Sequence, residues 1–211
     1  MAATLFLGLG LLGSGMTLMM AKAITFYEQG IVYANSFFTR ELAFDTVESY
    51  AFESRDMHQY GIYRESSFIL TLVPRDNRLC KITLSLSNYS PEPPGPMENI
   101  RKRVQQTCVA RMMQEIKSQN TTSWTNEITL GQDEIEIVTR KTRFRIAYDQ
   151  LSMSWERLTM PGLGIGYEPH LLFFIRNDPK QKPVFKLSPH ANNFFPGFEC
   201  LNRLRGTEME I

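Results

Sequence analysis

Residues 42–47 read Leu42-Ala43-Phe44-Asp45-Thr46-Val47, and residues 146–151 read Ile146-Ala147-Tyr148-Asp149-Gln150-Leu151. At an offset of 104 residues (146 − 42), every aligned pair except Thr46 and Gln150 is identical or chemically similar. Ile31 and Ile135 match at the same offset. We interpret the stretches as two copies of one unit, because self-similarity at a fixed offset is typical of a repeat.

The match continues further along the chain at an offset of 103 residues, which implies one single-residue gap. Four apolar positions of the first copy, Leu70, Leu72, Ile82 and Leu84, match Phe173, Ile175, Phe185 and Leu187 of the second. The two copies are therefore expected to superpose, with Phe44 on Tyr148 and Ile82 on Phe185.

Each copy is predicted to be an antiparallel β unit, because short apolar or alternating runs are separated by turn residues. The strands expected in the first copy are Ile24–Glu28, Ile31–Asn35, Phe38–Phe44, Val47–Glu53, Phe68–Val73 and Leu79–Leu86. Those expected in the second are Glu127–Leu130, Glu134–Arg140, Arg143–Leu151, Ser152–Glu156, Leu171–Arg176 and Val184–Leu187.

A helix is expected after each set of strands. From Met97 to Asn120 the apolar residues recur at spacings of three and four, which predicts an amphipathic helix. Its inward face would carry Ile100, Val104, Cys108 and Met112. The second helix is expected to be short, with one or two turns after Gly197, because Pro196 and Gly197 interrupt the preceding stretch.

The segment from Ala2 to Ala21 has no charged side chain and is long enough to cross a bilayer as a helix. A retained membrane anchor is the favoured interpretation. A cleaved signal peptide is a second, since Ala21-Lys22-Ala23 has the form of a cleavage site, and a buried core helix is a third.

The order of strands and helix resembles bacterial pleckstrin-homology-like (PH-like) domains. The resemblance is based on Phe26-Tyr27-Glu28-Gln29-Gly30-Ile31-Val32-Tyr33 followed by Phe44-Asp45-Thr46-Val47-Glu48-Ser49. It implies a binding or scaffolding role and adjoining transmembrane helices. The second copy departs from the pattern, because Asp133-Glu134 stands where the first copy has Gln29-Gly30.

These observations predict a mainly β (α+β) fold with two tandem PH-like β-barrels. Each barrel would be closed by a C-terminal helix, and one N-terminal transmembrane helix would precede them. The predicted divisions are residues 1–22 for the anchor or signal peptide, 23–120 for the first unit and 121–211 for the second.

Composition narrows the functional classes. A formal net charge of +1 argues against nucleic-acid binding, which needs a basic surface. Three widely spaced cysteines favour free thiols over a disulfide framework, and no metal site or cofactor is expected. The three histidines do not lie near a recognisable nucleophile turn, so no catalytic residue is assigned and the chain is predicted not to be an enzyme.

The densest basic stretch supplies the only candidate binding residues, Lys141, Arg143 and Arg145. On a strand these side chains would share one face and could contact anionic lipid head groups. The alternative is a solvated strand face whose charges keep a sheet edge soluble.

The favoured function is a membrane-anchored, non-enzymatic scaffold that binds a protein partner, with the membrane held through residues 2–21. The body would lie on the cytoplasmic side, because Lys22 follows the apolar run. Two alternatives remain: a lipid head-group binder that uses the basic strand face, and a secreted two-domain β protein released by signal-peptide cleavage. The sequence does not identify the partner, the ligand or the oligomeric state.

Overall fold

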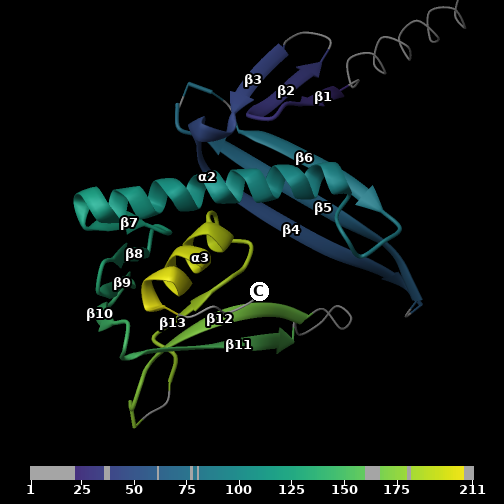
Figure 1. Cartoon of the computed structure of the whole chain (residues 1–211). Helices are drawn as coiled ribbons and strands as arrows, with labels where there is room; N and C mark the ends of the chain where they lie inside the picture. The colour runs from purple at the N-terminus through teal and green to yellow at the C-terminus, as the bar shows by residue number, and fades with distance from the viewer. Residues whose placement is uncertain are drawn as a thin grey trace, which may run out of the picture. The chain divides into compact units, whose positions relative to one another are not determined.

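The computed structural model describes residues 22–35, 39–60, 62–76, 78–79, 81–159, 167–179 and 182–206 (Figure 1). The chain packs into two compact units, Met1–Val47 and Glu48–Ile211. This division follows packing, whereas the boundary near residue 120 follows the sequence repeat and stays a prediction.

The described part of the first unit is a three-stranded antiparallel sheet followed by a single helical turn. The strands are β1 (Lys22–Phe26), β2 (Gly30–Asn35) and β3 (Thr39–Ala43), and the 3-10 turn η1 is Phe44–Thr46. The Thr46 hydroxyl donates to the Ala43 carbonyl at 2.7 Å, so the chain turns sharply after β3.

The second unit begins with a long meander and a long helix. The strands β4 (Val47–Gln59), β5 (Ile62–Pro74) and β6 (Ile82–Asn88) form one sheet, and α2 is Gly95–Gln119. Strands β4 and β5 have 13 residues each, so both extend well beyond the predicted ranges. The added part carries mostly polar side chains, which is why apolar alternation did not detect it.

Two further sheets and a second helix complete this unit. The strands β7 (Thr121–Ser123), β8 (Ile128–Gly131), β9 (Glu134–Val138) and β10 (Arg143–Ala147) form a four-stranded sheet. The strands β11 (Leu151–Thr159), β12 (Tyr167–Ile175) and β13 (Phe185–Leu187) form a three-stranded sheet, and α3 is Phe194–Arg205. Helix α3 is longer than expected, because Pro196 and Gly197 lie in its first turn, where proline is tolerated.

The repeat is visible in the strand pairing. Ile31 pairs with Leu42 between β2 and β3, and Ile135 pairs with Ile146 between β9 and β10, at the predicted offset. The Phe44 amide donates to the Gln29 carbonyl at 2.8 Å, and the Tyr148 amide donates to the Asp133 carbonyl at 3.1 Å. Phe44 and Tyr148 are both buried, as predicted. The order of strands and helix is thus the same in both copies, with β7 added in the second. The register of the last hairpin differs, however: Leu70 pairs with Leu84, whereas its counterpart Phe173 pairs with Phe185 and not with Leu187, so the predicted match of Ile82 with Phe185 is not kept in the pairing.

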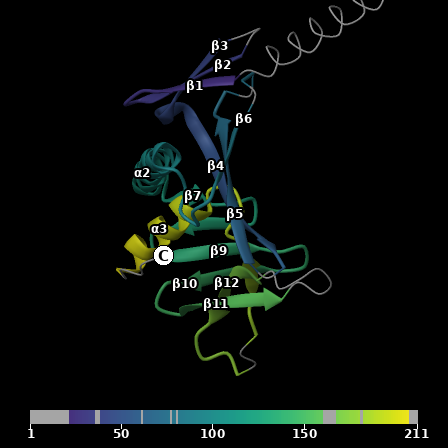
Figure 2. The same cartoon turned by 90° about the vertical axis from the view of Figure 1, so that its right-hand side faces the viewer.

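Helix α2 buries the face that the sequence predicted. Met97, Ile100, Val104, Cys108, Met112 and Ile116 are all buried. Its C-terminal half, with Val109, Met112 and Ile116, packs into the core around Trp124, Phe173 and Phe198. The helix of the first copy therefore also belongs to the core of the second, which the repeat did not predict. Figures 1 and 2 show α3 between α2 and strands β11 and β12.

The prediction of two barrels is wrong. The described strands form four separate sheets of three or four strands, and no closed barrel is found among them. Alternating strands only require that one face of each sheet be covered, and here α2 and α3 provide cover for the second copy.

The prediction of a single-pass membrane protein is also contradicted. Within the described ranges, no helix is both long enough and apolar enough to cross a bilayer. The segment Ala2 to Ala21, to which the span was assigned, lies outside those ranges.

Candidate functional site: a groove between two helices

The predicted basic residues lie on the β9–β10 hairpin, and their charges are largely offset. Arg143 Nε lies 3.1 Å and Arg145 Nε 3.4 Å from Glu136 Oε1, so both arginines project from one face, as expected. Arg145 Nε also lies 3.9 Å from Glu134. Lys141 is in the turn before β10 and not on the strand. Lipid contact by these residues stays a prediction, with less free positive charge than the sequence suggested.

A different surface of the second unit is concave. An open groove of about 710 Å³ runs beside α2 and α3, with one side formed by β4 and by the loop before α2. We call it the helix groove, and it is lined by Phe52, Glu92, Pro93, Glu98, Arg101, Lys102, Gln105, Gln106, Phe195, Glu199 and Arg203. Its charged residues comprise three acids and three bases.

Within the helix groove, two aromatic rings and one carboxylate hold the side chain of Arg101. Its guanidinium carbon lies 5.5 Å from the ring centre of Phe52 and 5.3 Å from that of Phe195. Such distances are within the range of cation–π attraction. Glu98, one helical turn earlier, accepts two hydrogen bonds from Arg101 at 2.7 and 2.8 Å. Both rings and the carboxylate thus hold one planar cation.

The electrostatics agree with this geometry. The hydrogen bonds from Arg101 lower the pKa of the Glu98 carboxyl, with a smaller contribution from the charge of Lys102. The same hydrogen bonds raise the pKa of Arg101, although partial burial opposes the effect. Both shifts favour the ionised forms, so the pair is ionised at neutral pH.

Gln105 joins the two sides of the helix groove. Its amide donates to Glu199 Oε2 on α3 at 2.8 Å, and its oxygen accepts from the Tyr50 hydroxyl of β4 at 3.3 Å. Arg203 lies 2.5 Å from the other oxygen of Glu199. Because Tyr50 is buried, its pKa is raised, and the hydroxyl stays a donor. One side chain of α2 therefore sets the spacing between β4 and α3.

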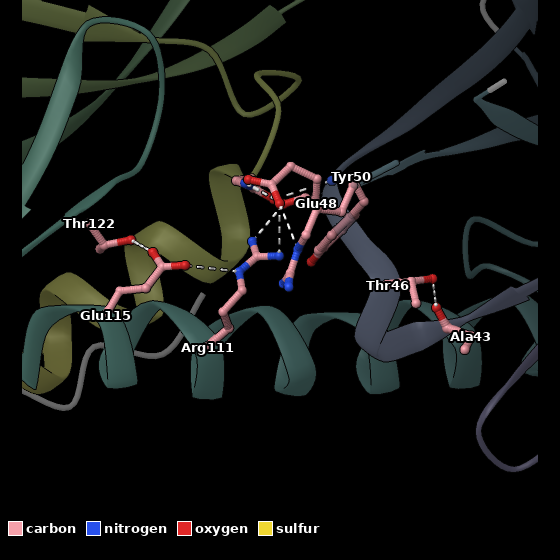
Figure 3. Close-up of polar contacts among 9 residues, drawn as sticks. Ala43, Thr46, Glu48, Tyr50, Arg111, Glu115 and Thr122 are labelled. Carbon is pink, nitrogen blue, oxygen red and sulfur yellow. Dashed lines mark hydrogen bonds and ion pairs between the residues drawn. The ribbon is translucent and has the colours of Figure 1, made fainter. Parts of the chain in front are cut away.

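A second polar cluster joins α2 to β4 and to β7. Figure 3 shows Arg111 on α2 directed at Glu48 at the start of β4. Arg111 Nη2 donates to the Glu48 carbonyl at 2.6 Å, and Nη1 lies 3.4 Å from its carboxylate. Glu115 lies 3.6 Å from Arg111 and accepts a hydrogen bond from Thr122 of β7. The chain of contacts runs from β7 through α2 to β4.

Asn193 fixes the start of α3 against β4. Its amide NH donates to the Tyr50 carbonyl at 2.7 Å, and its side-chain oxygen accepts from the Tyr50 amide at 3.2 Å. Its side-chain nitrogen also donates to the Glu48 carbonyl at 3.3 Å. The residue has φ 58°, a left-handed conformation that asparagine adopts more readily than most residues.

Replacing Asn193 by alanine is expected to lower the free energy of unfolding by about 2–3 kcal/mol, because two hydrogen bonds and the left-handed preference are lost together. Asn177 offers a matched control, since it has φ 67° and an exposed side chain. Asn177→Ala should cost about 1 kcal/mol. Urea unfolding of both variants measures the difference, and equal losses would show that the side-chain hydrogen bonds of Asn193 contribute nothing.

Cys108 and Cys200 are buried free thiols, and neither belongs to the helix groove. Burial raises the pKa of Cys108 to about 11 and that of Cys200 to about 12, from 9.0. The reactive form is the thiolate, so both thiols are protonated and inert in the folded chain at neutral pH.

In a Cys80→Ser variant, a thiol reagent such as Ellman's reagent at pH 8 should therefore label neither cysteine until denaturant is added. The raised pKa values also make the free energy of unfolding depend on pH. Above pH 9.0 the unfolded chain loses its thiol protons, whereas the folded chain keeps them until about pH 11 to 12. The free energy of unfolding is therefore expected to fall as the pH rises above 9.0. Labelling of one thiol at the rate of a free cysteine in the native chain would contradict this.

Sequence reasoning missed the helix groove. The signal that was present is the spacing of Glu98, Arg101, Lys102, Gln105 and Gln106, which places all five along one side of a helix. Nothing in the sequence shows that Phe52 and Phe195, which are 143 residues apart, both lie close to the Arg101 guanidinium. Among the residues that the structure describes, no cluster of His, Cys, Asp and Glu is placed to hold a metal ion.

No protein-family model matches the chain, and a search of curated proteins finds no similar sequence. The resemblance to PH-like domains therefore stays a prediction.

Proposed function

We propose that the chain is a non-catalytic binding protein that engages a protein partner through the helix groove. The observation that supports this most directly is the clamped Arg101, held by Phe52, Phe195 and Glu98. Arginine and aromatic side chains are enriched where binding energy concentrates in protein interfaces. Side chains that are already fixed lose little conformational entropy on binding, which favours affinity.

The composition of the helix groove favours a polypeptide over a small apolar ligand. Its volume of about 710 Å³ would suit either class. However, eight of its eleven lining residues are polar or charged, whereas small-molecule sites are mostly apolar with a few polar groups. A polypeptide offers main-chain donors and acceptors along its whole length, which such a lining can satisfy.

The test is affinity capture with a blocked groove and a matched control. Gln106 and Gln114 are both exposed glutamines of α2, and only Gln106 lines the groove. Full-length parent, Gln106→Trp and Gln114→Trp proteins would be used as bait in the same extract. We expect at least one captured protein to be lost with Gln106→Trp and kept with Gln114→Trp.

That protein would then be purified and its affinity for all three baits measured. The direct affinities should repeat the pattern, with about a tenfold or larger loss for Gln106→Trp, since the indole occupies the space of the partner. The proposal is wrong if every captured protein binds the two tryptophan variants equally.

A further inference from the structure

We infer that the helix groove recognises an acidic segment of the partner, with one aromatic residue flanked by carboxylates. This inference rests on the proposed function and specifies the chemistry of the partner. It is supported by the charge of the two helices, by the way in which the acids of the groove are already bound, and by the exposure of its cations.

Positive charge is concentrated on the two helices beside the groove. Helices α2 and α3 together contain seven cationic side chains, Arg101, Lys102, Arg103, Arg111, Lys117, Arg203 and Arg205, and three acidic ones, Glu98, Glu115 and Glu199. Their formal charge is +4 (7 − 3), whereas the whole chain has only +1. The lining itself, with three acids and three bases, has no net formal charge, so this excess surrounds the groove. It accelerates the approach of an acidic partner and disfavours a basic one.

The acids within the groove are largely neutralised. Glu98 binds Arg101 through two hydrogen bonds and also lies 3.6 Å from Lys102. Glu199 binds Gln105 and Arg203. By contrast, the side chain of Lys102 is 63% exposed and that of Arg203 is 56% exposed. Each cation can therefore accept a carboxylate of the partner while it keeps its present contact.

The aromatic residue of the segment is expected to contact Phe52 and Phe195. Both rings line the groove and are only partly buried, and each already has Arg101 on one side. An aromatic side chain of the partner could pack against the remaining ring surface in an offset or edge-to-face arrangement.

Glu92 disfavours a continuous polyanion. It lies in the loop before α2 and lines one end of the groove. A row of phosphates that follows the groove, as in a nucleic acid or at a lipid surface, would place negative charge beside Glu92, whose carboxylate repels it. A peptide can place its carboxylates at Lys102 and Arg203 and a neutral residue beside Glu92, so a peptide satisfies the pattern better.

The test uses full-length protein and three fluorescent peptides. The first has the sequence Gly-Asp-Glu-Phe-Glu-Asp-Gly, the second replaces its acids by lysine, and the third replaces its phenylalanine by glycine. Fluorescence anisotropy would be followed up to about 1 mM protein, since a short segment is expected to bind weakly. Vesicles that contain phosphatidylserine form a fourth arm.

The groove variant is Lys102→Gln with Arg203→Gln, and its matched control is Lys81→Gln with Lys117→Gln, two exposed lysines. Both remove two positive charges, and neither control residue lines the groove. We expect the acidic aromatic peptide to bind the parent and the control equally, and the groove variant about fivefold more weakly, as two exposed ion pairs would give. Binding should weaken with added salt, and both altered peptides should bind more weakly than the first.

Three outcomes would overturn the inference: equal or tighter binding of the lysine peptide, equal loss in the groove variant and the control, or absence of binding by the acidic peptide at 1 mM. Vesicle binding that depends on Lys102 and Arg203 without peptide binding would also overturn it, in favour of a lipid surface. In each case the capture experiment with Gln106→Trp still decides the proposed function by itself.

Discussion

Replacing Val104 by aspartate is expected to lower the free energy of unfolding by about 4 kcal/mol, a large part of the roughly 5–15 kcal/mol that is ordinary for a folded chain. Val104 lies in the middle of α2 and is 0% exposed. Its neighbours on the buried face, Ile100 and Cys108, are also buried, so a new carboxylate would lie among apolar side chains and away from solvent. The penalty of an unpaired buried charge therefore adds to the lost apolar contact.

Ala110→Asp is the matched control, because Ala110 is exposed on the same helix. It introduces the same side chain and carries only the helix-propensity cost, below about 0.7 kcal/mol. For a chain of this length, about 4 kcal/mol corresponds to a decrease in Tm of about 8–16 °C. Thermal unfolding followed by circular dichroism measures both variants, and a Val104→Asp protein as stable as Ala110→Asp would mean that this face of α2 is not a core face.

Helix α2 was well predicted because the physical signal is local. A spacing of three and four residues requires only the geometry of one helix, and it identified Ile100, Val104, Cys108 and Met112 as buried. The observed bounds, Gly95–Gln119, differ from the predicted Met97–Asn120 by one or two residues, which is the usual uncertainty of helix ends.

The repeat was also detectable, since equivalent turns need equivalent residues. The pairings of Ile31 with Leu42 and of Ile135 with Ile146 follow the offset that the aligned stretches gave. Closure of the sheets into barrels could not be deduced in the same way. Alternation indicates that one face of a strand is covered, but it does not say what covers it or whether two sheet edges meet.

The helix groove depends on contacts between distant parts of the sequence. Asn193 binds Tyr50 across 143 residues, and Gln105 binds Glu199 across 94. The basic stretch gives a second example. The sequence indicated Arg143 and Arg145 as candidate lipid-binding residues, but it did not show that both lie in ion-pair distance of Glu136. Side-chain partners of this kind follow from packing, which single-sequence patterns do not contain.

Replacing Gly197 by alanine is expected to lower the free energy of unfolding by about 3 kcal/mol, although alanine is the better helix former. Gly197 lies in the first turn of α3, and a β-carbon there would come within 2.0 Å of Trp124 Cδ1 and 2.1 Å of Nε1. Trp124 is 2% exposed and packs edge-on against Phe173 at 5.9 Å, so the indole has no room to withdraw. Helix and indole would have to separate, which disrupts the core shared by α2 and α3.

Two comparisons isolate this contact from the general effect of glycine in a helix. At Gly95, the first residue of α2, a β-carbon meets nothing within 4 Å, so Gly95→Ala should be neutral or stabilise by up to about 1 kcal/mol. The double variant Gly197→Ala with Trp124→Ala should lose less than the sum of the two single variants, because all three indole atoms that the new methyl group meets are removed. Urea unfolding of the parent, the two single variants at Gly197 and Trp124, and the double variant gives the coupling free energy between the two positions. We expect about 1–2 kcal/mol, as for residues in contact. Strict additivity would mean that α3 accommodates the methyl group by moving away from Trp124, and that the close approach of helix and indole contributes little to the stability of the second unit.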